Sequence, residues 1–401
     1  MKNKFLLTLL LLSISGMLSA QIGRVYPDGH GGCVFFPLGD ISFADQVVYY
    51  DHGNPMPEEE DRDPSKALGI PDYNEEEDIN FTSLGYGGEL IVKFTDNVLY
   101  DIDGNDLYIF EIGGNEAFEV FISKNGKDWI DLGKFGGGRT EIDIAPYVSK
   151  SDVFRYVKIK DLKTDNGPWP GADIDAIGAI GSSVKLKISG NVLFNTGEAT
   201  IKAPSVLRKI ADKIKQSGGK VIIEGYTDNV GSAEDNMILS QKRASSVKSF
   251  LVDSCGIDSN LISTQAFGET NPVADNSTAE GRQKNRRVEI IIFPHYKNTN
   301  DVTGVWDTDF GEMHIYRYGD TVAGWYSEDC GEIFGTFIDP HTLELTWAEN
   351  SSNQRCDKDL YGRHYIGKAI FKFNDDFTAF EGKWGYCDDE PTTAGWNGKR
   401  K

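Results

Sequence analysis

Asp228 and Arg243, near the middle of the chain, carry the clearest chemical pattern in the sequence. Asp228 follows a short apolar run and precedes a long amphipathic segment, where we expect a strand to end and a helix to begin. Asn236 and Arg243 are seven residues apart in that segment, so two helical turns bring them to the same face. A carboxylate and a guanidinium that converge on one hollow can bind a zwitterion, because each charge of the ligand meets its opposite. The alternative is that the two side chains pair as a surface salt bridge of small energetic value.

The stretches around these residues form a series of motifs along the central part of the chain. The stretches are Glu224–Asn229, Asn236–Ala244, Gly268–Glu269, Ala274–Arg282 and Asn285–Glu289. In order and spacing they resemble the OmpA-like peptidoglycan-binding domain, and the resemblance covers residues 184–293. It implies that Asp228 binds the ammonium group and Arg243 the carboxylate of diaminopimelate in the stem peptide of peptidoglycan. It also implies that Asn236 and one of the two residues Arg286 and Arg287 complete the polar lining of the site.

Two positions depart from the pattern of that family. Tyr226 stands where the family often has histidine, and Gly197 lies in a loop where a polar residue often helps. Both departures keep the charged pair in place but leave the stem-peptide preference open.

We expect this protein to bind its ligand without catalysing a reaction. A hydrolase needs a general acid and base with separated pKa values, or an activated nucleophile. A site in which Asp228 and Arg243 bind the two charged groups of a ligand supplies neither. The expected function is non-covalent binding of peptidoglycan, which anchors the flanking β-modules to the cell wall and requires no cofactor. The alternative is a carbohydrate-active enzyme or glycan-binding protein of the envelope that uses the N-terminal module and keeps the central domain as its anchor. A glycan or an envelope protein is the expected partner of the flanking modules.

The composition describes a soluble protein of several domains. Of the 401 residues, 39% are hydrophobic and 26% are charged, a mixture typical of globular chains, and the length exceeds one ordinary domain. The net charge of −21 argues against nucleic-acid binding, because phosphate recognition needs a basic surface. Residues 181–300 alone carry more basic than acidic side chains, and this change of charge along the chain indicates three domains.

The expected fold class is multidomain, with two β-modules around an α/β domain. Residues 22–182 contain short strands between turns, which indicates an antiparallel β-sandwich, and they resemble a galactose-binding-like jelly roll. Residues 184–293 alternate strands and helices in a βαβαββ order. Residues 301–400 indicate an antiparallel β-meander or barrel with tryptophans inside and glycines where strands bend. In the central domain we expect strands at 184–194, 221–224, 261–266 and 288–293, and helices at 203–216 and 234–252.

Four acidic residues of the N-terminal module suggest a calcium site. Asp173 and Asp175 lie in a glycine-rich stretch, and Asp106 and Glu111 lie elsewhere in the module. Carboxylate oxygens are the hard ligands that Ca²⁺ prefers, so the four could hold one ion. The alternative is an acidic, solvated surface with turn-forming aspartates.

The first 20 residues are predicted to be a cleavable secretory signal. Lys2 and Lys4 precede an apolar run, Phe5–Leu18, that is too short to span a bilayer as a helix, and small residues follow it. Cleavage after Ala20 would leave Gln21, where a lipid-anchored protein needs cysteine. We therefore expect an exported protein of the periplasm, associated with peptidoglycan and the outer membrane, without a lipid anchor or a transmembrane span.

The five cysteines, Cys33, Cys255, Cys330, Cys356 and Cys387, can form disulfides in an oxidising compartment, but their odd number leaves one over. The last three lie in every second connection of the C-terminal meander. Antiparallel hairpins therefore place them at one end, where a disulfide between two of them is geometrically possible. The pairing is otherwise open, and zinc is disfavoured because the sequence has no CxxC motif.

Overall fold

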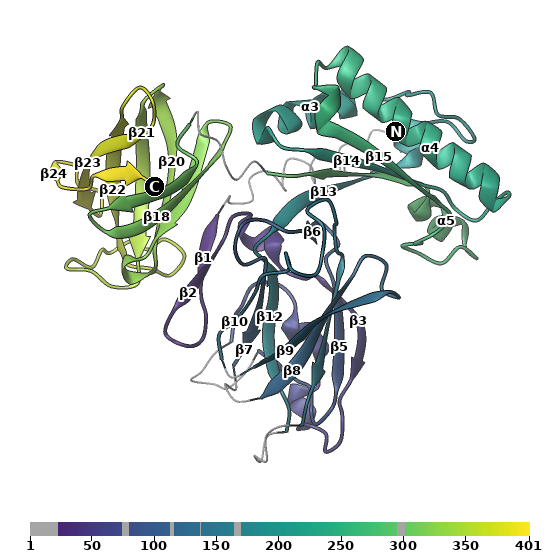
Figure 1. Ribbon diagram of the computed structural model, residues 1–401, viewed down its shortest axis with the longest axis horizontal. Helices are drawn as coiled ribbons and strands as arrows, with labels where there is room; N and C mark the ends of the chain where they lie inside the picture. Colours follow the sequence, from purple (N-terminus) through teal and green to yellow (C-terminus); the bar gives the residue numbers. More distant parts are fainter. Residues whose placement is uncertain (1–22, 74–79, 113–115, 137, 164–169, 295–300) are drawn as a thin grey trace.

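The computed structural model describes residues 23–73, 80–112, 116–136, 138–163, 170–294 and 301–401. Figure 1 shows three parts: a β-sandwich, an α/β unit whose helices cover one face of its sheet, and a C-terminal β-barrel. The predicted multidomain fold class is thus confirmed. The predicted signal segment, residues 1–20, lies outside the described residues. Within the described part of the chain, no helix combines the length and the apolar character that crossing a membrane requires.

The N-terminal part is the predicted antiparallel sandwich of two sheets. One sheet has the order β10-β7-β12-β4 and the other β3-β5-β11-β8-β9, while β1 and β2 form a separate hairpin. Alternate side chains of the strands face a common core; in β5, for example, Leu90 and Val92 are fully buried. The strands are β1 Arg24–Pro27, β2 Cys33–Phe36, β3 Gln46–Asp51, β4 Thr82–Ser83, β5 Glu89–Lys93, β6 Asn97–Leu99, β7 Leu107–Glu111, β8 Ala117–Ser123, β9 Trp129–Gly136, β10 Thr140–Ile142, β11 Tyr156–Asp161 and β12 Asp173–Ala179.

The central part contains the predicted strands and helices with two local differences. Its elements are β13 Ser182–Ser189, α2 Gly190–Leu193, α3 Pro204–Ser217, β14 Val221–Tyr226, α4 Ala233–Ser249, β15 Ile262–Gly268, α5 Ala279–Asn285 and β16 Arg287–Ile292. The strand expected at 184–194 ends at Ser189, because the chain turns into α2 and inserts Phe194 into the core. The short helix α5, capped by the Thr278 side chain, was not predicted.

Helices α3 and α4 pack by the apolar stripes that their sequences carry. The buried side chains of α3 are Val206, Leu207, Ile210, Ala211 and Ile214, which recur at helical spacing. Ala244 and Val247 of α4 are also buried, but Asn236, Ser240 and Arg243 share the buried side of that helix. Helix α4 therefore presents a polar as well as an apolar surface to the rest of the domain.

A strand of the sandwich extends the central sheet, whose order is β15-β14-β16-β13-β6. Strand β6 pairs with β13 in the register Leu99↔Ser182 and Asn97↔Val184. Next to this pairing, the Tyr100 and Phe293 rings meet edge to face at a centroid distance of 4.7 Å. The sandwich and the central domain are therefore joined by backbone hydrogen bonds and a shared apolar cluster, which the sequence did not predict.

Buried charges also cross this junction. Arg155 of the sandwich pairs with Glu224 of β14 at 2.5 Å, and both side chains are largely buried. Lys185 of β13 is buried and donates from Nζ to the Phe94 carbonyl oxygen at 3.1 Å. Burial lowers the pKa of Lys185 to about 7, against the attraction of Glu289.

The C-terminal part is a closed antiparallel barrel, because β22 pairs with β23 as well as with β21. Trp306, Trp347 and Trp396 are fully buried, as expected of a small barrel with a tryptophan core. The strands are β17 Gly304–Thr308, β18 Gly311–Tyr318, β19 Thr321–Tyr326, β20 Gly331–Asp339, β21 Thr342–Glu349, β22 Tyr365–Phe373, β23 Ala379–Tyr386, β24 Thr393–Ala394 and β25 Gly398–Arg400.

Two disulfides staple the barrel. Cys356 pairs with Cys387, which confirms that two of the three barrel cysteines are close enough to bond. The third, Cys330, pairs with Cys33 of the β1–β2 hairpin, 297 residues away in the sequence. Cys255 is the free thiol among the described cysteines.

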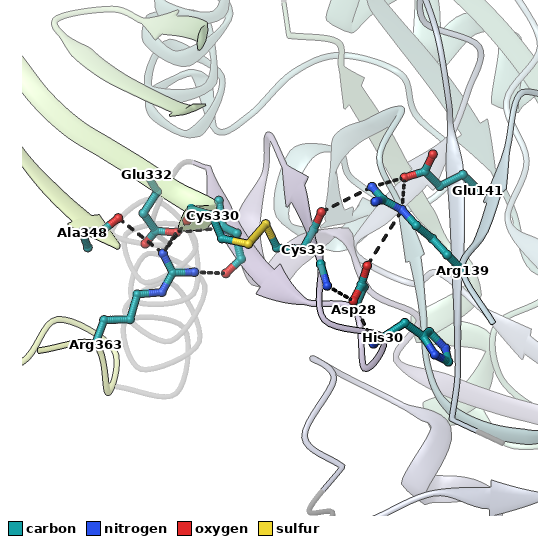
Figure 2. Close-up of a disulfide and its surroundings, with 11 residues drawn as sticks. Asp28, His30, Cys33, Arg139, Glu141, Cys330, Glu332, Ala348 and Arg363 are labelled. Atoms are coloured by element: carbon teal, nitrogen blue, oxygen red, sulfur yellow. Dashed lines mark hydrogen bonds and ion pairs between the residues drawn. A yellow bond between two sulfur atoms is a disulfide. The ribbon is translucent and has the colours of Figure 1, made fainter. Parts of the chain in front are cut away.

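The β1–β2 hairpin lies between the barrel and the sandwich (Figure 2). On the barrel side, the Val25 amide donates to Glu332 at 2.8 Å, and Arg363 donates to the Val25 carbonyl oxygen at 3.5 Å. On the sandwich side, Asp28 faces Arg139 at 3.9 Å. The disulfide therefore reinforces an interface that is already hydrogen-bonded.

We expect the Cys356→Ser/Cys387→Ser variant to unfold at lower denaturant concentration than the wild type. Removing a crosslink that closes a 31-residue span costs about 3.7 kcal/mol of unfolding free energy. Guanidinium titration followed by tryptophan fluorescence measures the barrel, since three tryptophans lie in its core. Cys255→Ser, which breaks no disulfide, is the control, and an identical midpoint for both variants would contradict the prediction.

Lys185 predicts a pH dependence of stability. Its pKa is about 7 in the folded protein and about 10.4 in the unfolded chain, so the unfolded state binds more protons between these values and stability rises with pH. Relative to Lys185→Met, the wild type should gain up to about 1.4 kcal/mol per pH unit from pH 7 to pH 10. Urea unfolding of both proteins at each pH measures this difference, and parallel pH profiles would disprove it.

Candidate functional site

Asp228 lies in the turn between β14 and α4. The Thr227 amide donates to the Gly268 carbonyl oxygen at 2.7 Å, which fixes this turn to the end of β15. The Asp228 Oδ1 atom accepts the Val230 amide at 3.2 Å, and Oδ2 accepts a hydrogen bond from the Arg286 guanidinium. Asp228 is only 6% exposed, so its charge is presented in a largely desolvated setting.

Arg243 projects from the buried side of α4, the face predicted from the seven-residue spacing. Its Nε donates to the Glu198 carbonyl oxygen at 3.0 Å, and its guanidinium lies 5.2 Å from the centre of the Phe194 ring. Burial and the neighbouring Arg286 cation lower the pKa of Arg243, while the Asp228 anion opposes them. Arg243, Arg286 and Asp228 therefore lie close enough for their charges to interact.

Asn236 helps to hold this arrangement together. Its Nδ2 donates to Glu269 at 2.8 Å and so links α4 to the segment after β15. Gly268 has a φ of +53°, and a Cβ there would lie 3.2 Å from the Met237 amide nitrogen. The Gly268–Glu269 motif thus combines a close backbone approach with a side chain that orients Asn236.

The two consecutive arginines lie in different surroundings. Arg286 ends α5 and reaches Asp228, whereas Arg287 begins β16 and pairs with Glu289 at 2.6 Å. The guanidinium of Arg287 also lies 3.7 Å from the centre of the Tyr226 ring. The structure therefore places Arg286 beside Asp228 and Arg287 in the buried charge network near the domain junction, because successive residues entering a strand point to opposite sides.

Two polar atoms beside Asp228 are buried without a hydrogen-bond partner among the described residues. They are the Nε of Arg286 and the Oγ1 of Thr227. Buried polar groups are normally paired, so these two atoms keep an unused capacity for hydrogen bonds next to Asp228. Thr227 had no role in the sequence prediction, although its position beside Asp228 in the motif could have suggested one.

Tyr226 and Gly197, the two departures from the family pattern, have different surroundings. Tyr226 is buried, stacks on Phe267 at 5.0 Å and donates to Glu224 at 2.8 Å, so its contacts are those of the junction network. Gly197 has a φ of +74°, and a Cβ at this position would meet no atom of a non-neighbouring residue within 4 Å, so the loop there is open.

The four residues predicted to hold calcium do not form one cluster. Asp106 directly precedes β7 and Glu111 ends it, about 16 Å further along the strand. Asp175 lies on β12 and accepts the Asp72 amide at 3.0 Å, and burial raises the pKa of Asp175 to about 7. Asp173 begins β12, opposite Ser83 of β4. One ion cannot reach both ends of β7, so this set does not make a single site.

The arrangement around Asp228 is suited to binding a small zwitterion. One carboxylate stands among two guanidinium groups, which leaves an excess positive charge for a ligand carboxylate while Asp228 can accept a ligand ammonium. Low exposure strengthens both interactions, since charges attract more strongly away from bulk water.

Comparison with known proteins places this site in a known family. The OmpA family matches residues 193–286. Over 117 residues the chain is 42% identical to the probable lipoprotein YiaD of Escherichia coli, and the alignment covers 28% of this chain and 53% of YiaD. Over 114 residues it is 42% identical to the peptidoglycan-binding protein ArfA of Mycobacterium tuberculosis, covering 28% of this chain and 35% of ArfA. This chain thus spans about half, or less, of the length of these curated relatives.

A solved structure is similar to part of the chain. It is the cell wall anchor of the T6SS from Pseudomonas aeruginosa, with 34% sequence identity and a TM-score of 0.27. The alignment covers 28% of this chain and 82% of that one. Residues 193–286, which contain Asp228, Asn236, Arg243 and Arg286, are an OmpA family domain.

Proposed function

We propose that the central domain binds peptidoglycan, and that Asp228 and Arg243 hold the zwitterionic end of diaminopimelate in the stem peptide. The observation that carries this proposal is the set of opposite charges on two elements of an OmpA family domain. A relative that is 42% identical over 114 residues is a peptidoglycan-binding protein, ArfA, which supports the same ligand.

Arg243 would bind the ligand carboxylate. Its Nε is engaged by the Glu198 carbonyl oxygen and its plane rests near Phe194, so the guanidinium is held in one orientation. The two terminal nitrogens then form the planar fork that binds a carboxylate through two parallel hydrogen bonds. Arg286 adds a second positive charge to this side of the site.

Asp228 would bind the ligand ammonium. Its carboxylate is fixed by the Val230 amide and by Arg286, so little conformational freedom is lost when the ammonium arrives.

The flanking modules would be carried to the wall by this anchor. We propose an exported, non-enzymatic protein of the cell envelope, in the periplasm and close to the outer membrane. The strand pairing of β6 with β13 ties the sandwich to the central domain, and the Cys33–Cys330 disulfide ties the barrel to the β1–β2 hairpin. Whether a glycan or an envelope protein binds those modules stays a prediction.

Sedimentation with purified sacculi tests the binding site. Asp228→Ala and Arg243→Ala should each weaken binding at least tenfold, because removing one partner of a desolvated charge pair costs about 2–5 kcal/mol. Lys242→Ala is the matched control, since it removes a positive charge from the neighbouring, exposed position of the same helix. Equal pelleting of all four proteins would refute the proposed mechanism.

One further variant tests the role of the Arg243 guanidinium. Arg243→Lys keeps the charge but loses the planar fork, so we expect binding between that of the wild type and that of Arg243→Ala.

An altered ligand tests which group of the ligand Arg243 binds. Stem peptides whose diaminopimelate carboxylate is amidated should bind to the wild type at least tenfold more weakly than the free acid, as measured by calorimetry. If Arg243→Ala discriminated equally well between the two peptides, the carboxylate would be bound elsewhere.

A further inference from the structure

Three aspartates of the sandwich, far in the sequence from the proposed peptidoglycan-binding residues, bring their carboxylates together. Asp101 and Asp106 lie in the connection between β6 and β7, and Asp143 directly follows β10. One carboxylate oxygen from each lies within 4.8 Å of the others. Asp101 and Asp106 are buried and Asp143 is exposed, so the cluster opens to solvent on one side.

Asp106 holds the segments that carry this cluster in place through its hydrogen bonds. Its Oδ1 accepts the Ile102 amide at 2.7 Å and its Oδ2 accepts the Ile144 amide at 2.9 Å. Its own amide donates to the Ile142 carbonyl oxygen at 2.9 Å. Asp143 is thereby held between two residues that are both bonded to Asp106. These bonds explain why Asp106 is buried, even without a ligand.

The burial of Asp101 is not explained by hydrogen bonds of this kind. Its Oδ1 is buried and has no hydrogen-bond partner among the described residues, and Asp101 as a whole is only 5% exposed. The nearby cation Lys150 donates instead to the exposed Asp103, at 3.1 Å. A buried carboxylate oxygen without a donor, next to two more carboxylates, is unfavourable, and a cation bound between them would remove this cost.

We propose that Asp101, Asp106 and Asp143 bind a calcium ion. Three carboxylates form a set of hard oxygen ligands, which Ca²⁺ accepts in flexible geometry together with water on the exposed side. Zinc prefers nitrogen and sulfur ligands, and the cluster contains no histidine or cysteine. Magnesium demands near-ideal octahedral geometry and retains its water, so it should bind more weakly.

This site differs from the one predicted from the sequence. Asp106 is common to both, but Asp101 and Asp143 take the place of Asp173, Asp175 and Glu111. Asp101 and Asp106 are five residues apart in one loop, but Asp143 lies 37 residues further along the chain, so only the fold shows that it joins them.

The ion would lie at the joint between the sandwich and the central domain. Asp101 directly follows Tyr100, whose ring packs on Phe293 and whose amide donates to the Gly181 carbonyl oxygen at 2.9 Å. The Gly181 amide in turn donates to the Asp106 carbonyl oxygen at 3.0 Å. A Cβ at Gly181 would lie 2.1 Å from the Tyr100 carbonyl oxygen, so these segments are in close contact. Calcium would therefore stabilise the connection through which the sandwich reaches the central sheet.

Calcium titration of the full-length protein after EDTA treatment and dialysis tests the site. The wild type should bind one Ca²⁺ by calorimetry and unfold at higher temperature when calcium is added, with a smaller effect from an equal concentration of magnesium. Asp101→Asn and Asp143→Asn should weaken calcium binding at least tenfold. Asp103→Asn is the matched control, because it removes the same charge from the same loop at a residue outside the cluster.

The difference in unfolding temperature between Asp101→Asn and the wild type shows whether Asp101 ligates calcium or is merely structural, because this difference should change sign when calcium is added. Without calcium, Asp101→Asn relieves the repulsion between carboxylates and should unfold at the same or a higher temperature than the wild type. With saturating calcium, it should unfold at a lower temperature than the wild type. The proposal fails if the wild type binds no calcium at 5 mM, if Asp101→Asn and Asp143→Asn bind it as the wild type does, or if Asp175→Asn alone abolishes binding.

Discussion

The pairing of β13 with β6 on one side and β16 on the other is the interaction on which the other features depend. The pairing with β6 continues the central sheet into the sandwich. The pairing with β16 aligns Ser189 with Arg287 and so sets the residue at which β16 begins. The Gly190 amide then donates to the Arg286 carbonyl oxygen at 2.7 Å, which leaves the Arg286 side chain beside Asp228. One strand therefore positions both the domain junction and part of the ligand site.

Buried charges are balanced at the junction and unbalanced at the two proposed binding sites. At the junction, Arg155 pairs with Glu224 and Arg287 pairs with Glu289, and burial lowers the pKa of the remaining cation, Lys185, to about 7. Around Asp228 two arginines face one carboxylate, and around Asp101 three carboxylates face no bonded cation among the described residues. Because an uncompensated buried charge is costly, such an excess is expected where a ligand supplies the missing charge.

The barrel is attached by different means from the central domain. The sandwich and the central domain share a sheet, whereas the barrel is fixed by the β1–β2 hairpin and the Cys33–Cys330 disulfide. The hairpin itself contacts both partners, through Glu332 on the barrel and Arg139 on the sandwich. The hairpin and the disulfide hold the barrel against the sandwich, and the sandwich shares a sheet with the central domain, so an anchor in the central domain would also hold the barrel at a defined place.

The sequence by itself determined the features that depend on neighbouring residues. The apolar spacing of α3, the alternation in β5 and the shared face of Asn236 and Arg243 follow from local backbone periodicity, and the motif order identified the OmpA family domain. Tertiary structure alone decided which distant segments meet. Asn97 and Ser182 are 85 residues apart, and Cys33 and Cys330 are 297 apart. The choice of Arg286 over Arg287, and of Asp101 and Asp143 as neighbours of Asp106, follows from strand register and loop closure, which no local pattern of residue types encodes.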